Sequence, residues 1–168
     1  MAINFNEKFN KNSFEEKFEG ICEKLLPPQG YGVYDLRYLS GSSTLRIFIT
    51  KNGEVKGIDI NDCIIVDKLL SPFIEEENWI PDNFVLEVSS PGIYREIRRA
   101  DQLKFSLGEL IKIKFNSNME DKDFKNKLQI GTLVEFGESE MLVEFEEDKK
   151  KIAIKYEMIK SVHAELKI

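Results

Sequence analysis

The feature that most constrains this chain is a Ser-Ser-Pro-Gly turn at residues 89–92, which separates two stretches of different texture. Before the turn, two long segments with apolar residues at helical spacing alternate with strand-like segments. After the turn, short segments in which apolar and polar residues alternate follow one another closely, and no long segment has helical spacing. Proline fixes one backbone angle and glycine accepts a positive one, so the residue types themselves set the geometry of the turn. The chain should therefore change architecture here.

The first ninety residues predict an αββαβ layer of two helices on a three-stranded sheet. Ser13 and Glu16 form a capping-box pattern for the first helix, and Asp59 is a suitable N-cap for the second. The expected elements are a helix over Ser13–Leu26, strands over Tyr31–Leu39 and Thr44–Thr50, a helix from Asp59 to about Glu76 whose buried face carries Ile60, Ile64, Leu70 and Ile74, and a strand over Asn83–Val88.

The remaining residues predict a small closed barrel of SH3 or Sm type, because five short strands follow one short helix. Those elements are a helix over Ala100–Ser106 and strands over Leu110–Phe115, Leu128–Phe136, Glu140–Phe145, Lys151–Ile154 and Ser161–Leu166. The expected architecture is thus a two-domain α+β protein. Residues 1–90 form the N-terminal domain, residues 91–99 a linker that starts with the turn of Ser89, Ser90, Pro91 and Gly92, and residues 100–168 the barrel.

Charge and composition exclude several functions. The net charge of −6 lies wholly on residues 1–90, because residues 91–168 hold 15 basic and 15 acidic side chains. A protein that coats nucleic acid by charge alone needs an excess of Lys and Arg, so that mode is excluded. Cys22 and Cys63 lie in apolar stretches and read as buried free thiols in a reducing compartment, and Met1–Asn10 lacks an apolar signal core. We expect a cytoplasmic protein.

No motif points to catalysis, a metal or a cofactor. One histidine, His163, and two separated cysteines cannot form a Cys/His zinc site. Asp59 and Asp62 could suggest a calcium loop, but the glycine and glutamate that such a loop needs are missing, so helix capping accounts for them better. There is no phosphate-binding glycine loop, and no acid–base pair has a spacing that demands catalysis.

Two groups of residues are candidates for contact with RNA or protein. Arg95, Arg98 and Arg99 follow the Ser-Ser-Pro-Gly turn, where backbone N–H groups and guanidinium groups could bind a phosphate or carboxylate. The alternative is a hinge with solvated arginines. The second group is a loop in which Phe124 stands among lysines that could contact phosphates; the alternative is a solvated loop with Phe124 packed locally. Its lysines are Lys122, Lys125 and Lys127.

The segment Leu86–Gly92, followed by Arg95, resembles the hallmark of the bacterial ribosome maturation factor RimP family. Thr44–Ile49 resembles the second strand of that family, and Ile58–Cys63 resembles its helix entry. The family usually continues the turn with Asp-Arg-Pro, where this chain has Tyr94-Arg95-Glu96. The resemblance implies an α/β N-terminal domain and an Sm-like C-terminal barrel. It further implies a cytoplasmic, non-catalytic factor that binds the immature small (30S) ribosomal subunit.

By that resemblance, we expect a monomer that assists assembly of the small subunit and 16S rRNA folding, partly through small-subunit protein twelve. No membrane, small-molecule substrate, metal or cofactor is expected. Charge reversal at Arg95 should then weaken subunit binding without unfolding the protein. One alternative is a generic RNA-binding Sm-like module without a ribosomal role. The other is a small hydrolase or transferase, which would need a deep pocket that gathers titratable groups.

Overall fold

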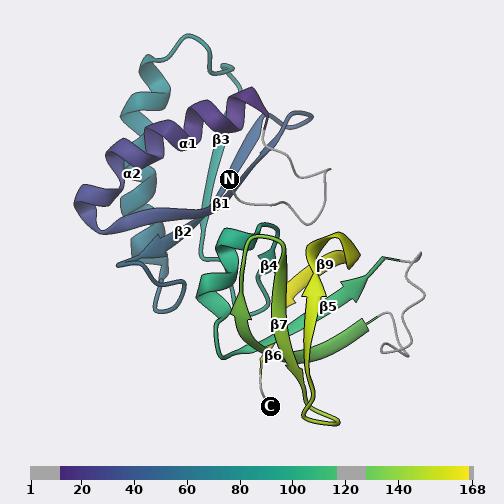
Figure 1. Ribbon diagram of the computed structural model, residues 1–168. Coiled ribbons are helices and arrows are strands. Elements are labelled where there is room, and N and C mark those ends of the chain that lie inside the picture. The colour runs from purple at the N-terminus through teal and green to yellow at the C-terminus, as the bar shows by residue number, and fades with distance from the viewer. Residues whose placement is uncertain (1–11, 117–127, 167–168) are drawn as a thin grey trace. The chain divides into compact units, whose positions relative to one another are not determined.

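The computed structural model describes residues 12–116 and 128–166, which form a mixed α+β fold (Figure 1). The described residues divide into two compact units, one ending at Gly92 and the other beginning at Ile93. The Ser-Ser-Pro-Gly turn thus ends the first unit. Each unit has its own hydrophobic core.

The first unit contains helices and strands in the predicted order. They are α1 (Ser13–Leu25), the 3₁₀ turn η2 (Pro27–Gln29), β1 (Tyr31–Leu39), β2 (Thr44–Lys51), α2 (Ile60–Glu76) and β3 (Val85–Ser89). β1 and β2 form an antiparallel hairpin, and β3 pairs with β2 in parallel after the chain has crossed over through α2. Leu45, Ile47 and Ile49 are fully buried on one face of β2, as their alternation predicts.

The helices cover that face of the sheet, and both are fixed by reciprocal caps. The capping box of α1 consists of Asn12 and Glu15, one residue before the predicted pair of Ser13 and Glu16. Asn12 Oδ1 accepts from Glu15 N at 2.9 Å, and Glu15 Oε1 accepts from Asn12 N at 3.1 Å. Asparagine is as good an N-cap as serine, so the chain satisfies the same backbone donors one position earlier.

The buried face of α2 differs from the prediction only in its first part, because Leu70 is buried and Ile74 packs against the core as predicted. Ile60 and Ile64 are 74% and 45% exposed, whereas Asp62, Val66 and Leu70 point inward. The reason is that Asp62 bonds to the sheet, which sets the rotation of the helix about its axis. Residues two positions away on a helix lie on nearly opposite faces, so an inward Asp62 turns its two isoleucine neighbours outward.

The described residues of the second unit form a six-stranded sheet and two 3₁₀ segments. In chain order they are β4 (Glu96–Ile97), η3 (Ala100–Ser106), β5 (Leu110–Phe115), β6 (Leu128–Phe136), β7 (Glu140–Phe145), β8 (Lys151–Lys155), η4 (Tyr156–Met158) and β9 (Ile159–Ala164). β4 falls inside the segment that the sequence assigned to a linker, where it pairs with β9.

The structure does not support the predicted SH3/Sm-like closed barrel. The strand order is β4-β9-β5-β6-β7-β8, and within the described residues no ladder joins β4 to β8. A barrel closes only when its first and last strands share hydrogen bonds. β4 is two residues long and already pairs with β9, so it offers too little backbone to close the sheet.

Candidate functional site

The Ser-Ser-Pro-Gly turn has the backbone geometry that its residue types predict. β3 ends at Ser89, whose hydroxyl donates to the carbonyl of Ser90 at 3.1 Å. Pro91 is buried, and Gly92 has a φ of +83° with no heavy atom within 4 Å of an added Cβ. Backbone conformation, not lack of space, is therefore what requires glycine at position 92.

The arginines after the turn are bound to their own unit. Arg95 is only 6% exposed, and its Nη2 donates to the carbonyl of Phe105 at 2.9 Å and to Ser106 Oγ at 2.8 Å. Glu109 Oε2 lies 3.9 Å from the same nitrogen. These contacts hold the end of η3 against the strand that Arg95 precedes. A partner cannot reach a guanidinium buried in this way, so the geometry favours a positioning role for Arg95.

Arg98 and Arg99 help to form the start of η3. Gln102 Oε1 accepts from the backbone N–H of Arg98 at 2.8 Å and from that of Arg99 at 3.1 Å. Arg98 is 5% exposed, and Arg99 Nε lies 3.3 Å from Asp101 Oδ1. The structure therefore places two of the three predicted contact arginines below the surface. The other predicted contact residues, Lys122, Phe124, Lys125 and Lys127, lie outside the described residues.

Asp62 is the centre of a polar network that joins α2 to the sheet. Its Oδ1 accepts from the Tyr31 hydroxyl at 2.6 Å and lies 3.1 Å from Lys51 Nζ, and its Oδ2 accepts from the N–H of Asp59 at 2.9 Å. Asp59 Oδ1 in return accepts from the N–H of Asp62 at 3.0 Å. The acidic pair therefore caps the helix, as the sequence analysis predicts.

The network changes the acidity of its members. The hydrogen bond from Tyr31, the backbone bond from Asp59 and the charge of Lys51 together lower the pKa of Asp62 from 3.8 to about 2. The same hydrogen bond, with burial, raises the pKa of Tyr31 to about 12. Both shifts favour a carboxylate and a phenol at neutral pH, so this group is a fixed ion pair and not a site poised for proton transfer.

The cysteines are also poor candidates for chemistry. Both are free thiols, and burial raises the pKa of Cys22 to about 12 and that of Cys63 above its ordinary value. Since the thiolate is the nucleophile, neither is activated. Within residues 12–116 and 128–166, no three His, Cys, Asp or Glu side chains gather to hold a metal ion. The helices of this part of the chain include none that is long and apolar enough to cross a membrane.

Two surface grooves offer binding chemistry instead. In the first unit, a groove of about 530 Å³ lies between α2 and β3 and combines apolar side chains with the carboxylates of Asp67, Glu75, Glu77 and Asp82. In the second unit, a groove of about 730 Å³ runs over the outer face of β5 and β9 and carries Tyr94, Lys112, Lys114 and His163. We call them the acidic groove and the lysine groove.

The sequence analysis singled out neither lysine, although the signal was present. Lys112 and Lys114 alternate with the buried Ile111 and Ile113 along β5, a pattern that places both lysines on one outer face. What the pattern could not supply was the neighbour. His163 is 51 positions away from Lys112, and only the pairing of β5 with β9 brings the two residues opposite each other.

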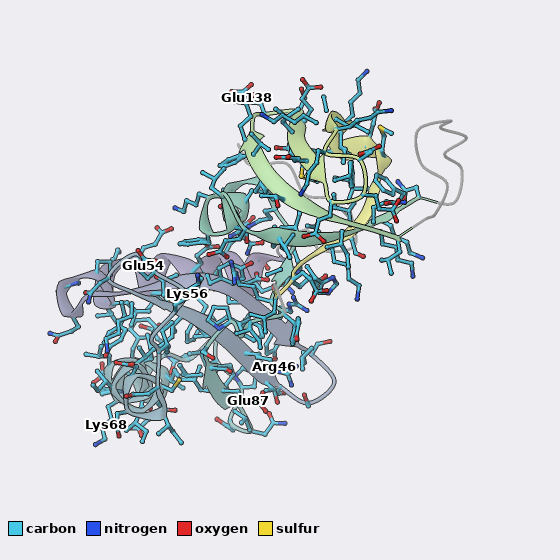
Figure 2. All side chains as sticks on the ribbon, turned by 90° about the horizontal axis from the view of Figure 1, so that it is seen from below. Arg46, Glu54, Lys56, Lys68, Glu87 and Glu138 are labelled. Carbon is cyan, nitrogen blue, oxygen red and sulfur yellow. The ribbon has the colours of Figure 1, made fainter. Side chains whose placement is uncertain are left out.

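The opposite face of the first sheet is polar and self-paired. Arg46 and Glu87, on the neighbouring strands β2 and β3, form an exposed ion pair at 2.9 Å, and Figure 2 shows the two side chains together. Arg37 lies above the ring of Phe48, with 5.8 Å between the guanidinium carbon and the ring centroid. Because these cations already have partners, this face is a weaker candidate for phosphate binding.

These features define a small two-unit α+β protein with charged surface grooves. A comparison with family models gives the particular group. Residues 21–94, from within α1 to just before β4, match the model described as the RimP N-terminal domain. Residues 21–94 thus form a RimP N-terminal domain, and this match supports assignment of the chain to the RimP family of ribosome maturation factors.

Proposed function

We propose that this protein binds the immature small (30S) ribosomal subunit and assists its assembly and the folding of 16S rRNA without catalysing a reaction. The observation that carries the proposal is the match of residues 21–94 to the RimP N-terminal domain. The two grooves of opposite character also support it, because a ribosomal particle presents both RNA and basic protein. Such a factor acts by stabilising the subunit conformation that it binds more tightly.

The acidic groove is the surface that we assign to a ribosomal protein. Glu75 and Asp82 are exposed and line this groove together with apolar side chains such as Phe84 and Ile74. A negative surface repels bare RNA but attracts Lys- and Arg-rich segments. We infer that small-subunit protein twelve, the partner that the resemblance implies, is bound by this groove. A cytoplasmic location and a monomeric state belong to the same proposal.

Sedimentation tests the proposal directly. The purified protein is mixed with free small subunits, with large subunits and with intact 70S ribosomes, and each mixture is centrifuged through a sucrose cushion. We expect co-sedimentation with free small subunits and little with the other two particles. Equal binding to all three would contradict a small-subunit function and favour a generic RNA-binding module.

A deletion strain supplies the second test. Loss of the protein should lead to accumulation of free subunits that contain precursor 16S rRNA, seen by sucrose gradient and by RNA end mapping. The full-length protein expressed from a plasmid should restore the normal profile. A normal profile in the deletion strain under cold and warm growth would contradict the proposed role.

A further inference from the structure

The lysine groove is formed by neighbouring strands of the second unit. Lys112 on β5 lies opposite His163 on β9 and Ile130 on β6, and Lys114 lies opposite Ser161 and Leu128. Because Ile111, Ile113 and Phe115 fill the core, the lysines between them face outward. Two consecutive strands, β5 and β6, and the more distant β9 therefore contribute to one continuous outer face.

Tyr94 adds an exposed aromatic ring to this face. It lines the same groove and is 54% exposed, although burial of a tyrosine ring in the core would be favourable. It stands two residues before β4, and the carbonyl of the intervening Arg95 accepts from the N–H of Ala164, the last residue of β9. Buried Arg95 thus anchors the backbone beside an exposed ring.

The side chains of the groove match the parts of a nucleotide. Lys112 and Lys114 are two residues apart on a strand, which separates their Cα atoms by about 7 Å. Within the described part of the chain, neither lysine forms an ion pair. Exposed cations contact phosphates, and an exposed ring stacks on a base. Leu128, which is 48% exposed, offers apolar contact next to Lys114.

Carboxylates limit the positive part of the face. Glu165 lines the groove, and Glu96 lies opposite His163 in the β4–β9 pair. The cationic part is therefore the short strip around Lys112 and Lys114, which suits a few nucleotides and not a long duplex. An acidic peptide could also meet the two lysines, but it would make no use of the exposed Tyr94 ring.

We propose that the lysine groove binds a short single-stranded segment of RNA, with a base stacked on Tyr94 and phosphates held by Lys112 and Lys114. Ser161 and His163, on the neighbouring strand β9, supply further hydrogen-bond donors. This inference rests on the proposed function and deepens it, because it names the surface and the kind of nucleic acid through which the chain contacts the subunit.

Fluorescence anisotropy with the full-length protein tests the groove. The probe is a labelled single-stranded RNA of about ten nucleotides, a length in the range of single-strand binding sites. We expect the double variant Lys112→Gln/Lys114→Gln to bind at least tenfold more weakly. Each lost phosphate contact lowers the salt dependence on a single strand by about 0.7, so the slope of log K against log salt should fall by about 1.4.

Two further variants separate charge from stacking. Tyr94→Leu keeps apolar bulk but removes the ring, so binding should weaken about tenfold while the salt slope stays the same. The matched control is Lys151→Gln/Lys155→Gln, which removes the same charge from two exposed positions on β8. Equal losses in the control and groove variants would overturn the proposal, as would an unchanged affinity in Tyr94→Leu.

Competition and sedimentation distinguish the remaining outcomes. Displacement of the RNA by a poly-glutamate peptide at lower concentration than by unlabelled RNA would overturn the choice of RNA as ligand. Wild-type protein that sediments with small subunits while the groove variants sediment equally well would overturn this inference and leave the proposed function standing. RNA binding through the groove without subunit binding would support the inference and contradict the proposed function.

Discussion

Arg95 places a positive charge among groups that are mostly neutral. Its Nη2 donates hydrogen bonds to two neutral oxygens, the carbonyl of Phe105 and the hydroxyl of Ser106. The nearest carboxylate oxygen of Glu109 is 3.9 Å from the same nitrogen. Among the residues that the structure describes, Nε of Arg95 has no hydrogen-bond partner. A buried cation of this kind has given up much of its hydration, so its remaining hydrogen bonds must offset the cost of its burial.

Arg95→Ala should therefore destabilise the protein by about 2–3 kcal/mol, because it leaves buried acceptors unsatisfied and removes packed methylene groups. Urea denaturation followed by circular dichroism measures the effect. The matched control is Arg46→Ala, which breaks an ion pair exposed on both sides and should cost less than about 1 kcal/mol. An equal loss of unfolding free energy in the two variants would show that the buried contacts of Arg95 contribute little to stability. Arg95 would then again be a candidate for contact with a partner.

Asp62 makes the free energy of unfolding depend on pH in the acidic range. Its pKa is about 2 in the folded protein and 3.8 without the network, so the folded state binds fewer protons and is favoured above about pH 4. The contribution should disappear as the pH falls from about 4 to about 2. Other carboxylates titrate there as well, so the informative quantity is the difference in unfolding free energy between wild type and Asp62→Asn.

That difference should be largest above pH 4 and should shrink toward pH 2. Tyr31→Phe removes the largest cause of the shift and should raise the pKa of Asp62, which carbon-detected NMR of the carboxyl can follow. A difference that stays constant from pH 6 to pH 2 would mean that Asp62 acts only through its shape and its hydrogen bonds.

At the scale of elements, local sequence patterns predict most of the strands and helices correctly. The features that they miss depend on pairing between residues far apart in the sequence. β1, β5, β6 and β7 have the predicted bounds, because alternation and turn residues define them locally. The rotation of α2 could not be predicted, since it depends on the bond between Asp62 and Tyr31 across 31 positions. The two-residue β4 and the open sheet were likewise invisible, because only pairing with β9 defines that strand.

The candidate site follows the same rule. The turn at Gly92 was predictable because proline restricts its own φ angle and glycine readily accepts a positive one. The burial of Arg95 was not predictable, because arginine is usually exposed and its acceptors on η3 belong to a different element. The lysine groove required the register of three strands, which no local pattern contains.

Glycine substitutions test the backbone of single elements. Gly20 lies inside α1, and an added Cβ would meet nothing within 4 Å, so Gly20→Ala should stabilise the protein by about 1 kcal/mol. Gly92→Ala should destabilise it by about 1–2 kcal/mol, because its φ of +83° disfavours any Cβ. Thermal melts of both variants check the signs. Stabilisation by both would show that position 92 can abandon its positive φ.

At the scale of the whole molecule, the charge of −6 is unevenly distributed between the units. The residues up to position 90 carry all of it, and the remainder is neutral overall. A neutral unit can still bind RNA where its cations gather on one face, as Lys112 and Lys114 do. An acidic unit is suited to basic protein. Under the proposed function, this distribution favours contact with RNA through one unit and contact with basic protein through the other.

This assignment predicts that the two grooves contribute independently to subunit binding. Glu75→Gln/Asp82→Asn in the acidic groove should weaken binding to small subunits, whereas Glu23→Gln/Glu54→Gln, at exposed positions of the same unit, should not. Combined with Lys112→Gln/Lys114→Gln, the losses of binding free energy should add within about 0.5 kcal/mol, as those of independent sites without shared partners do. Quantitative sedimentation measures the cycle. A combined loss equal to that of either pair alone would mean that both grooves serve a single contact, and the division of partners between the units would be wrong.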